Sequence, residues 1–388
     1  MITIGLMKCF QSQPTAANVQ LTSTELQQRG LQGIQIRDIA KLQTALEGFE
    51  RLESEGWQVP LFRGAIQLYE NHPDAALQEF AKLKPEGPIR PPLLLLTGEA
   101  LYRVGQLEDA EKCLELAIQD TPESVDALRW LATVAYDLGE IERTLLILGD
   151  VSRLAPHDYR PHHMQGSIFH DFGEHSRAIS ELTEALKLST ATDVQTEVSI
   201  LLASSQMSLK QFAAALITLQ KCPSNTIAMS LKADCLWQSG RIDEAHEMLR
   251  QAESLGELLP AGKRLKARFA IERNEWIEAR ALLDSLITAD PGDDESHYLM
   301  AQLFQLLKND TEYRLHLKQS EVIKSLKSQM TDLSQKATRE PANAEVRDQL
   351  AIICDQLGLK PLAKVWRMAA LSCRRRTPTA VPLEKALP

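Results

Sequence analysis

Residues 91–124 read PPLLLLTGEALYRVGQLEDAEKCLELAIQDTPES, and residues 125–158 read VDALRWLATVAYDLGEIERTLLILGDVSRLAPHD. Each line is 34 residues long, and the two match column by column when one is written above the other. A fixed period of this length is typical of proteins built from stacked structural repeats. The matched columns are Leu94 with Leu128, Gly98 with Ala132, Leu101 with Ala135, Gly105 with Gly139, Ala110 with Thr144, Leu114 with Leu148, Ala117 with Val151, and Pro122 with Pro156.

Each 34-residue line predicts two helices joined by a tight turn. In the first line Leu94, Gly98 and Leu101 recur at helical spacing, and Gly105 then interrupts the pattern. A second amphipathic segment follows, and Pro122 closes it. One such hairpin cannot bury its own apolar face, so it needs a neighbour on each side. The chain is therefore predicted to be an all-α array of antiparallel helix hairpins.

These columns resemble the tetratricopeptide repeat (TPR), which has small and aromatic positions at these spacings and a closing proline. Gly98 and Ala110 stand where the two helices of a hairpin approach closely, and Leu114 fills the space beside them. The resemblance implies a right-handed α-solenoid, here of about nine TPR-like units. It also implies that the first helix of each hairpin lines a concave groove.

The repeat frame also predicts how the chain is divided. Residues 311–339 contain no glycine or proline, which predicts an unusually long helix. An irregular junction near 193–225 predicts two arms of the solenoid, and Arg367 predicts an exposed outer face on a terminal capping unit. The chain is predicted to begin with a loose N-terminal segment (1–33) and a capping helix (34–56), followed by TPR-like units one to four in a strict 34-residue frame (57–192). After a frame shift come units five to seven and the first part of unit eight (193–310). A long helical segment (311–340), a terminal TPR-like unit (341–373) and a disordered tail (374–388) complete the prediction.

The resemblance places a set of polar and aromatic side chains on the first helices, facing the groove. Aromatic and arginine side chains are enriched at recognition surfaces, so we expect this set to bind a protein or peptide. The alternative for any one aromatic is that it packs between neighbouring helices. The groove candidates are Tyr102, Arg103, Arg129, Thr133, Tyr136, Asp137, Arg160, His163, Ser167, His170, Asp234, Trp237, Arg264, Arg268 and Tyr298.

Some members of the family hold the C-terminal carboxylate of a peptide in a clamp of Lys, Arg and Asn side chains. Arg264 and Arg268 occupy clamp-like columns here, but Asp234 stands in the preceding unit where an asparagine is needed. A second carboxylate at that position would repel the ligand. The sequence therefore argues against a carboxylate clamp.

Five of the nine histidines fall within 19 residues, four of them in the fourth unit, which raises the question of a metal site. His163 and His170 share a helix face but lie about 10 Å apart along the axis, at about 1.5 Å per residue. Zinc holds its nitrogen ligands at about 2 Å, so these two cannot share one ion. No metal site is predicted, and structural or groove-lining histidines with some pH sensitivity are the favoured interpretation. The five are His157, His162, His163, His170 and His175.

Composition and motifs exclude several other classes. The net charge of −9 gives no basic surface for nucleic acid, and no apolar run is long enough to span a membrane. The N-terminal residues lack the pattern of an export signal. Six cysteines without a C-x-x-C pair favour reduced thiols and a cytoplasmic location. No nucleotide-binding, hydrolase or kinase motif occurs, and no cofactor is predicted.

The sequence thus predicts a non-catalytic adaptor or scaffold that binds a partner protein or peptide in its groove. The alternative is a regulatory or recruitment subunit of a separately encoded enzyme. A third and weaker hypothesis is an enzyme whose active site lies in the histidine-rich fourth unit. The identity of the partner and the oligomeric state are not encoded in any pattern of the sequence.

Overall fold

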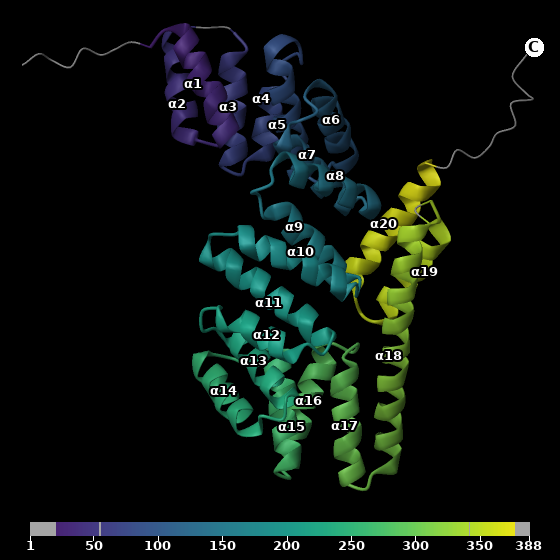
Figure 1. The fold of residues 1–388 in the computed structure, drawn as a ribbon. Coiled ribbons are helices and arrows are strands. Elements are labelled where there is room, and N and C mark those ends of the chain that lie inside the picture. The colour runs from purple at the N-terminus through teal and green to yellow at the C-terminus, as the bar shows by residue number, and fades with distance from the viewer. Residues whose placement is uncertain (1–20, 54–55, 341, 377–388) are drawn as a thin grey trace, which may run out of the picture. The chain divides into compact units, whose positions relative to one another are not determined.

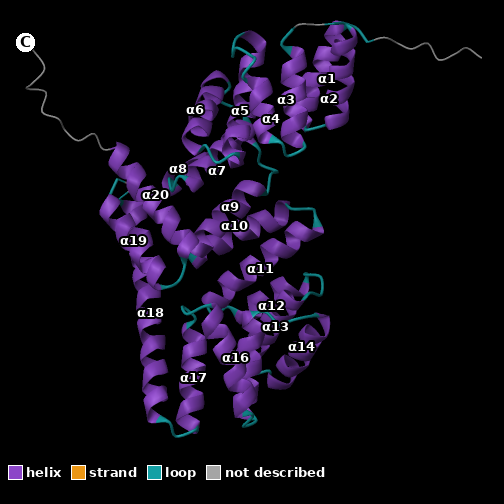
Figure 2. Cartoon of the chain, turned by 180° about the vertical axis from the view of Figure 1, so that it is seen from behind, coloured by secondary structure: helices purple, strands orange, loops and turns teal. Residues whose placement is uncertain are grey.

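The computed structural model describes residues 21–53, 56–340 and 342–376. Over these residues the chain is all helical, with twenty α-helices, one short 3-10 helix and no strand (Figure 2). It divides into two compact units, Met1–Thr121 and Pro122–Pro388. The predicted loose segment up to residue 20 and the predicted tail from residue 377 lie outside the described residues.

Unit 1 contains three helix hairpins, α1/α2, α3/α4 and α5/α6. Gly98 lies on α5 opposite Leu114 of α6, and a Cβ added to Gly98 would stand 2.6 Å from Leu114 Cγ. The small residue is therefore what allows the two helices to approach. The helices are α1 (Ser23–Ile36), α2 (Ile39–Arg51), α3 (Gln58–Tyr69), α4 (Pro73–Phe80), the 3-10 helix η1 (Gly87–Ile89), α5 (Arg90–Arg103) and α6 (Leu107–Asp120).

The first hairpin differs from the prediction, which placed a loose segment up to residue 33 and one capping helix after it. Thr22 and Glu25 form a capping box that starts α1, because each side chain binds the backbone N–H of the other. Leu26 and Ile34 of α1 are buried in the core of unit 1. Arg37 ends the helix in the left-handed conformation. The N-terminal element is thus a complete hairpin, α1/α2.

Unit 2 contains seven hairpins that follow one another along the chain, α7/α8 to α19/α20 (Figure 1). From α7 to α17 the first helices start 32 to 35 residues apart, and α19 follows after the long helix α18. The helices are α7 (Val125–Asp137), α8 (Ile141–Leu154), α9 (Arg160–Asp171), α10 (His175–Leu188), α11 (Thr192–Ser208), α12 (Phe212–Gln220), α13 (Thr226–Gln238), α14 (Ile242–Leu255), α15 (Pro260–Glu272), α16 (Trp276–Ala289), α17 (Asp294–Leu306), α18 (Asp310–Arg339), α19 (Ala344–Gln356) and α20 (Lys360–Arg376).

The frame shift near 193–225 does not divide the protein. These residues form the ordinary hairpin α11/α12, which packs against α10 on one side and α13 on the other. The boundary between the two compact units lies at Thr121 and Pro122 instead. The first helices α11, α13, α15 and α17 start at Thr192, Thr226, Pro260 and Asp294, each 34 residues after the one before, so the period continues through this region.

Helix α18 is the long helix that the sequence predicts. It is 30 residues long, and the side chain of Asn309 caps its first turn by accepting from the N–H of Glu312. It packs along α17 and then continues to α19 (Figure 1). No helix among the described residues is long and apolar enough to cross a membrane.

The terminal hairpin α19/α20 returns to the beginning of unit 2, which the repeat pattern does not predict. Trp366 on α20 is 2% exposed and packs on Phe172, with ring centroids 4.8 Å apart. Arg347 on α19 is 1% exposed and its Nη2 lies 2.6 Å from a carboxylate oxygen of Glu142. Both views show α20 beside α8 and α10 (Figures 1 and 2). Hairpins that are distant in the chain are therefore joined.

The predicted exposure of the terminal hairpin is seen at one residue of α20. Arg367 is exposed and forms an ion pair with Asp355. The neighbouring Trp366 is buried, so only one face of the hairpin is open to solvent. Residues 374–376, predicted as tail, continue α20.

Candidate functional site

A pocket of about 410 Å³ opens among the first helices of consecutive hairpins in unit 2. Helices α11, α13, α15 and α17 each contribute to its lining, and these are the helices that the resemblance assigns to the groove. We call it the groove pocket and define it by Met207, Asp234, Gln238, Arg264 and Glu295. It brings together two of the predicted groove residues, Asp234 and Arg264.

Asp234 lies partly buried in the groove pocket and its charge is poorly compensated. Burial and the nearby carboxylate of Glu295 raise the pKa of Asp234 to about 6. Arg268 and Arg264 act in the opposite direction, as does a hydrogen bond with the Gln238 side chain. In the described chain no arginine or lysine reaches ion-pair distance of Asp234. Near neutral pH the carboxylate is therefore mostly ionised but has no ion pair.

The two arginines of α15 are held by acidic residues at the start of α17. Arg264 Nη1 lies 2.7 Å from Asp293 Oδ2, and Arg264 Nε lies 3.4 Å from Glu295 Oε2. Arg268 Nη2 lies 3.7 Å from the same oxygen of Glu295. Burial opposes ionisation of Asp293, but Arg264 and Ser296 hold its pKa below the usual range. Asp293 also caps α17, so the position of Arg264 is fixed by a helix start.

Two predicted aromatic residues lie next to this charged group. The guanidinium carbon of Arg268 is 4.4 Å from the centroid of the Trp237 ring, which is a cation–π contact. Tyr298 is 39% exposed on α17, and Lys324 Nζ from α18 is 5.1 Å from the centre of its ring. Trp237 is partly buried against the core of α13, α14 and α15 and has a cation on its ring, whereas Tyr298 is exposed beside a cation.

The predicted arginines of α7 and α9 are engaged within the protein. Arg129 Nη2 lies 2.6 Å from Asp158, and Arg129 Nη1 lies 2.7 Å from Asp126. Arg160 Nε lies 2.8 Å from Asp158. Burial opposes ionisation of Asp158, but Arg160 and Arg129 hold its pKa below the usual range. Thr133 donates its hydroxyl to the carbonyl of Arg129, 3.1 Å away. This cluster joins the hairpin α7/α8 to the hairpin α9/α10.

The remaining polar candidates of α7 and α9 lie near one another in sequence but form no compact site. Burial, with the carboxylates of Asp171 and Asp137, raises the pKa of Tyr136. Asp137 and Ser167 are partly exposed. In unit 1, Arg103 Nη2 lies 2.7 Å from the buried Glu99, and its neighbour Tyr102 is partly exposed.

The histidines His163 and His170 of α9 have different partners. His163 Nε2 lies 3.7 Å from Glu197, whereas His170 Nδ1 lies 2.8 Å from the hydroxyl of Ser205. The rings of His170 and His175 are 5.4 Å apart, edge to face. Among the described residues no three His, Cys, Asp or Glu side chains are grouped to hold a metal ion.

The pH sensitivity of His170 should appear as a loss of stability in acid. Burial and then His175 lower the pKa of His170 from 6.5 to about 4. Between these values the unfolded chain binds the proton and the folded chain does not. The free energy of unfolding should therefore fall as the pH drops from 6.5 to 4, by up to about 3 kcal/mol from this residue.

Urea unfolding at pH 7 and pH 4.5 measures this contribution. His170→Asn should reduce the difference in unfolding free energy between the two pH values, while the exposed His157→Asn should leave it unchanged. An equal pH dependence in all three proteins would contradict the assignment to His170.

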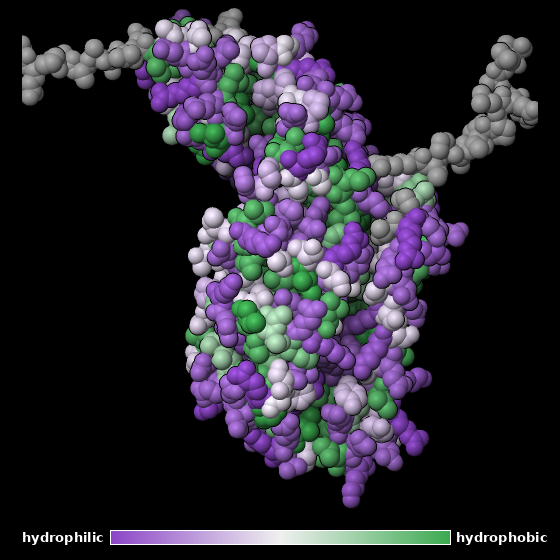
Figure 3. Space-filling view, viewed as in Figure 1, coloured by the Kyte–Doolittle hydropathy of each residue, from purple (hydrophilic) through white to green (hydrophobic). Residues whose placement is uncertain are grey.

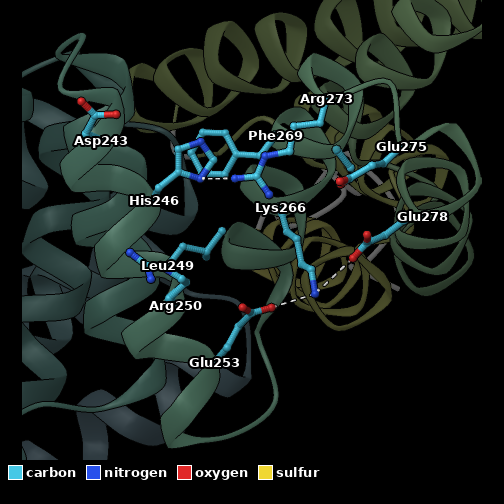
Figure 4. Close-up of a pocket in the computed structure, with 11 residues that line it drawn as sticks. Asp243, His246, Leu249, Arg250, Glu253, Lys266, Phe269, Arg273, Glu275 and Glu278 are labelled. Atoms are coloured by element: carbon cyan, nitrogen blue, oxygen red, sulfur yellow. Dashed lines mark hydrogen bonds and ion pairs between the residues drawn. The ribbon is translucent and has the colours of Figure 1, made fainter.

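A second pocket, of about 530 Å³, lies among α14, α15 and α16 (Figure 4). His246 stacks on Phe269 with centroids 3.5 Å apart, and its Nδ1 lies 3.2 Å from Arg273 Nη2. Lys266 Nζ lies 2.8 Å from Glu253 and 3.3 Å from Glu278. Lys266 and Arg273 thus have partners inside the protein. No sequence motif marks this pocket.

The sequence analysis missed part of the groove pocket. Glu295 could have been found from the helix period, because it precedes Tyr298 by three positions and so shares its face. Met207 and Gln238 carry no such signal, since both lie in the last turn of a helix where the repeat pattern is weak.

The comparisons with known proteins agree with this architecture. Sequence profiles described as tetratricopeptide repeat match residues 95–159 and 236–303. A search of curated proteins gives no match. Together, the profile matches and the array of hairpins define an α-solenoid repeat protein. The chain is a tetratricopeptide-repeat protein.

Similar folds occur among solved structures. The C-terminal part of a TPR repeat-containing protein from Cytophaga hutchinsonii has a TM-score of 0.50 at 14% identity, covering 61% of this chain and 97% of that one. A tetratricopeptide repeat protein from Parabacteroides merdae has a TM-score of 0.45 at 14% identity, covering 61% and 93%. The human IFIT1 dimer with PPP-AAAA has a TM-score of 0.38 at 18% identity, covering 91% and 94%. The first likeness bears on the fold alone, and the other two support no inference.

Proposed function

We propose that this protein is a non-catalytic scaffold that binds a partner protein or peptide in the groove of unit 2. Tetratricopeptide repeats imply a role in protein–protein interaction, and the fold is typically non-catalytic. The groove pocket is the observation that carries the proposal. It lies on the first helices of four consecutive hairpins and is bordered by Trp237, Arg268 and Tyr298.

The side chains around the groove pocket favour a partner recognised by polar contacts. Tyrosine, tryptophan and arginine dominate the binding energy of many interfaces. In the face of unit 2 that Figure 3 shows, hydrophobic residues are interspersed with hydrophilic ones. The net charge of −9 disfavours nucleic acid as the partner, because phosphate binding needs neutralising cations. A cytoplasmic location stays a prediction from the cysteine pattern.

The alternative proposal is a regulatory or recruitment subunit of a separately encoded enzyme. It uses the same groove but differs in the class of the partner. Recovery of an enzyme in a fixed ratio to this protein would favour it over a general scaffold.

A quantitative pull-down from native lysate with three baits tests the groove. The baits are the wild type, a groove variant with Arg268→Ala and Tyr298→Ala, and a control variant with Arg273→Ala and Glu278→Ala in the second pocket. A partner enriched on the wild type should fall at least 10-fold on the groove variant, because truncating interface anchors costs about 2 kcal/mol or more each. The control variant should retain it.

The pull-down is interpreted only for baits with wild-type helicity by circular dichroism. Equal recovery on the wild type and the groove variant would contradict the proposal. Loss on the control variant alone would assign binding to the second pocket instead.

A further inference from the structure

We propose that the groove pocket receives a cationic side chain, lysine or arginine, from the partner. The inference rests on the proposed function and specifies the chemistry of the ligand. It runs opposite to the carboxylate clamp of related proteins, for which the sequence already lacks the required asparagine. Two observations carry it: a partly buried carboxylate without an ion pair, and apolar walls beside it.

The carboxylate is that of Asp234. Gln238 gives it a hydrogen bond, but no cation of the described chain forms an ion pair with it. Arg264 could turn toward it only by leaving Asp293, which is 5% exposed and would then be a buried charge without its partner. Breaking such a pair is strongly unfavourable. The arginines of α15 therefore do not neutralise Asp234 directly.

The other carboxylates near Asp234 already have cationic partners. Asp293 pairs with Arg264, and Glu295 pairs with Arg264 and Arg268. Lys210 also lines the pocket, from the turn between α11 and α12, and is exposed. Of the two carboxylates that line the pocket, Asp234 is the one without an ion pair, so a cation bound beside it would supply that partner.

The shape of the pocket suits a long basic side chain. Met207 and Leu231 line it together with Asp234, so apolar walls lie next to the carboxylate. Lysine and arginine have aliphatic stems that pack on apolar surface while the charged end reaches a polar group. A volume of about 410 Å³ is enough for one such side chain and part of the backbone that carries it.

The second pocket does not offer the same chemistry. Its central cation, Lys266, already lies between Glu253 and Glu278, and Arg273 is held at His246 (Figure 4). Glu253 and Glu278 therefore already share a cation, whereas Asp234 of the groove pocket has no ion pair.

Met207 provides a reporter inside the pocket. The full chain, labelled with 13C at the methionine methyl groups, is titrated with N-acetyl-arginine amide and followed by NMR. N-acetyl-norleucine amide is the uncharged probe and N-acetyl-glutamate amide is the anionic one. The Met207 signal is assigned with Met207→Leu, and Met330, which contacts Cys354 at 3.8 Å, serves as a reporter outside the pocket.

The arginine probe should shift the Met207 signal saturably and leave Met330 unchanged. Asp234→Asn, which keeps the shape and removes the charge, should weaken this binding about 10-fold or more. Without probe, the Met207 signal should titrate with a midpoint near pH 6, the pKa of Asp234. With probe at about ten times its dissociation constant, the midpoint should fall by about one pH unit, because the cation binds the ionised form.

Several results would overturn the proposal. They are equal binding of the arginine and norleucine probes, tighter binding of the glutamate probe, unchanged affinity in Asp234→Asn, or no saturable shift of Met207. None of these affects the pull-down with the groove variant. If that variant still loses the partner, the groove function stands and only the cationic specificity fails.

Discussion

Trp366→Ala should lower the free energy of unfolding of unit 2 by about 3–5 kcal/mol, the range for removing a buried large aromatic side chain. Trp366 is 2% exposed and packs on Phe172, whose position belongs to the turn between α9 and α10. The substitution removes the aromatic contact between the terminal hairpin and the start of unit 2. The effect should be larger than that of any groove substitution, because the groove residues are partly exposed.

Arg367→Ala is the matched control for this prediction. Arg367 follows Trp366 in the chain but points outward, to an exposed ion pair with Asp355. Such surface pairs contribute about 0–1 kcal/mol. Urea unfolding followed by circular dichroism gives the stabilities, and hydrogen exchange locates the change. Trp366→Ala should speed exchange in α19, α20 and the turn before α10, and equal effects of the two substitutions would contradict the packing described here.

Gly139→Ala should destabilise unit 2 more than Gly240→Ala, although the two glycines occupy equivalent turns. Both have a positive φ, 77° and 76°, at which an alanine costs about 1–2 kcal/mol. Around Gly240 a Cβ meets nothing within 4 Å. At Gly139 it would stand 2.4 Å from the backbone nitrogen of Ala369 and 2.5 Å from the carbonyl oxygen of Val365.

The difference between the two glycine variants isolates the contact with α20. Backbone atoms cannot move aside as the end of a side chain can, so α20 must shift or detach. We expect Gly139→Ala to cost about 1–3 kcal/mol more than Gly240→Ala, the range for overpacking a close contact. Urea unfolding of both variants measures this, and a difference below about 0.5 kcal/mol would show that α20 does not lie against Gly139.

The sequence predicts the hairpins well because the contacts that define a hairpin lie between residues of the same repeat. The close approach of Gly98 to Leu114, and the left-handed turn at Gly105, lie within one hairpin, and a 34-residue period records them directly. The same logic placed Asp234 and Arg264 on neighbouring first helices, where the structure finds a shared pocket. Their roles in binding remain proposals.

The repeat pattern does not predict two features of the structure, helix α1 and the packing of α19/α20 on the start of unit 2. Helix α1 was missed because its polar, glutamine-rich surface hides the few buried positions, such as Leu26 and Ile34. The return of α19/α20 was missed because a period describes neighbours in the chain only. Nothing in the spacing of Trp366 or Arg347 connects them with Phe172 or Glu142, and Trp366 occupies an ordinary apolar column.

The return of the terminal hairpin also sets the order of folding. Most contacts of a repeat protein form between neighbours and can build up during synthesis, one hairpin after another. Arg347 and Glu142 are 205 positions apart, and Ser372 and Glu140 are 232 positions apart. At ordinary rates of translation, on the order of 5–20 residues per second, Phe172 leaves the ribosome about ten to forty seconds before Trp366. During that interval the early hairpins present an uncovered apolar surface to the cell, and a chain that stops before α20 keeps it.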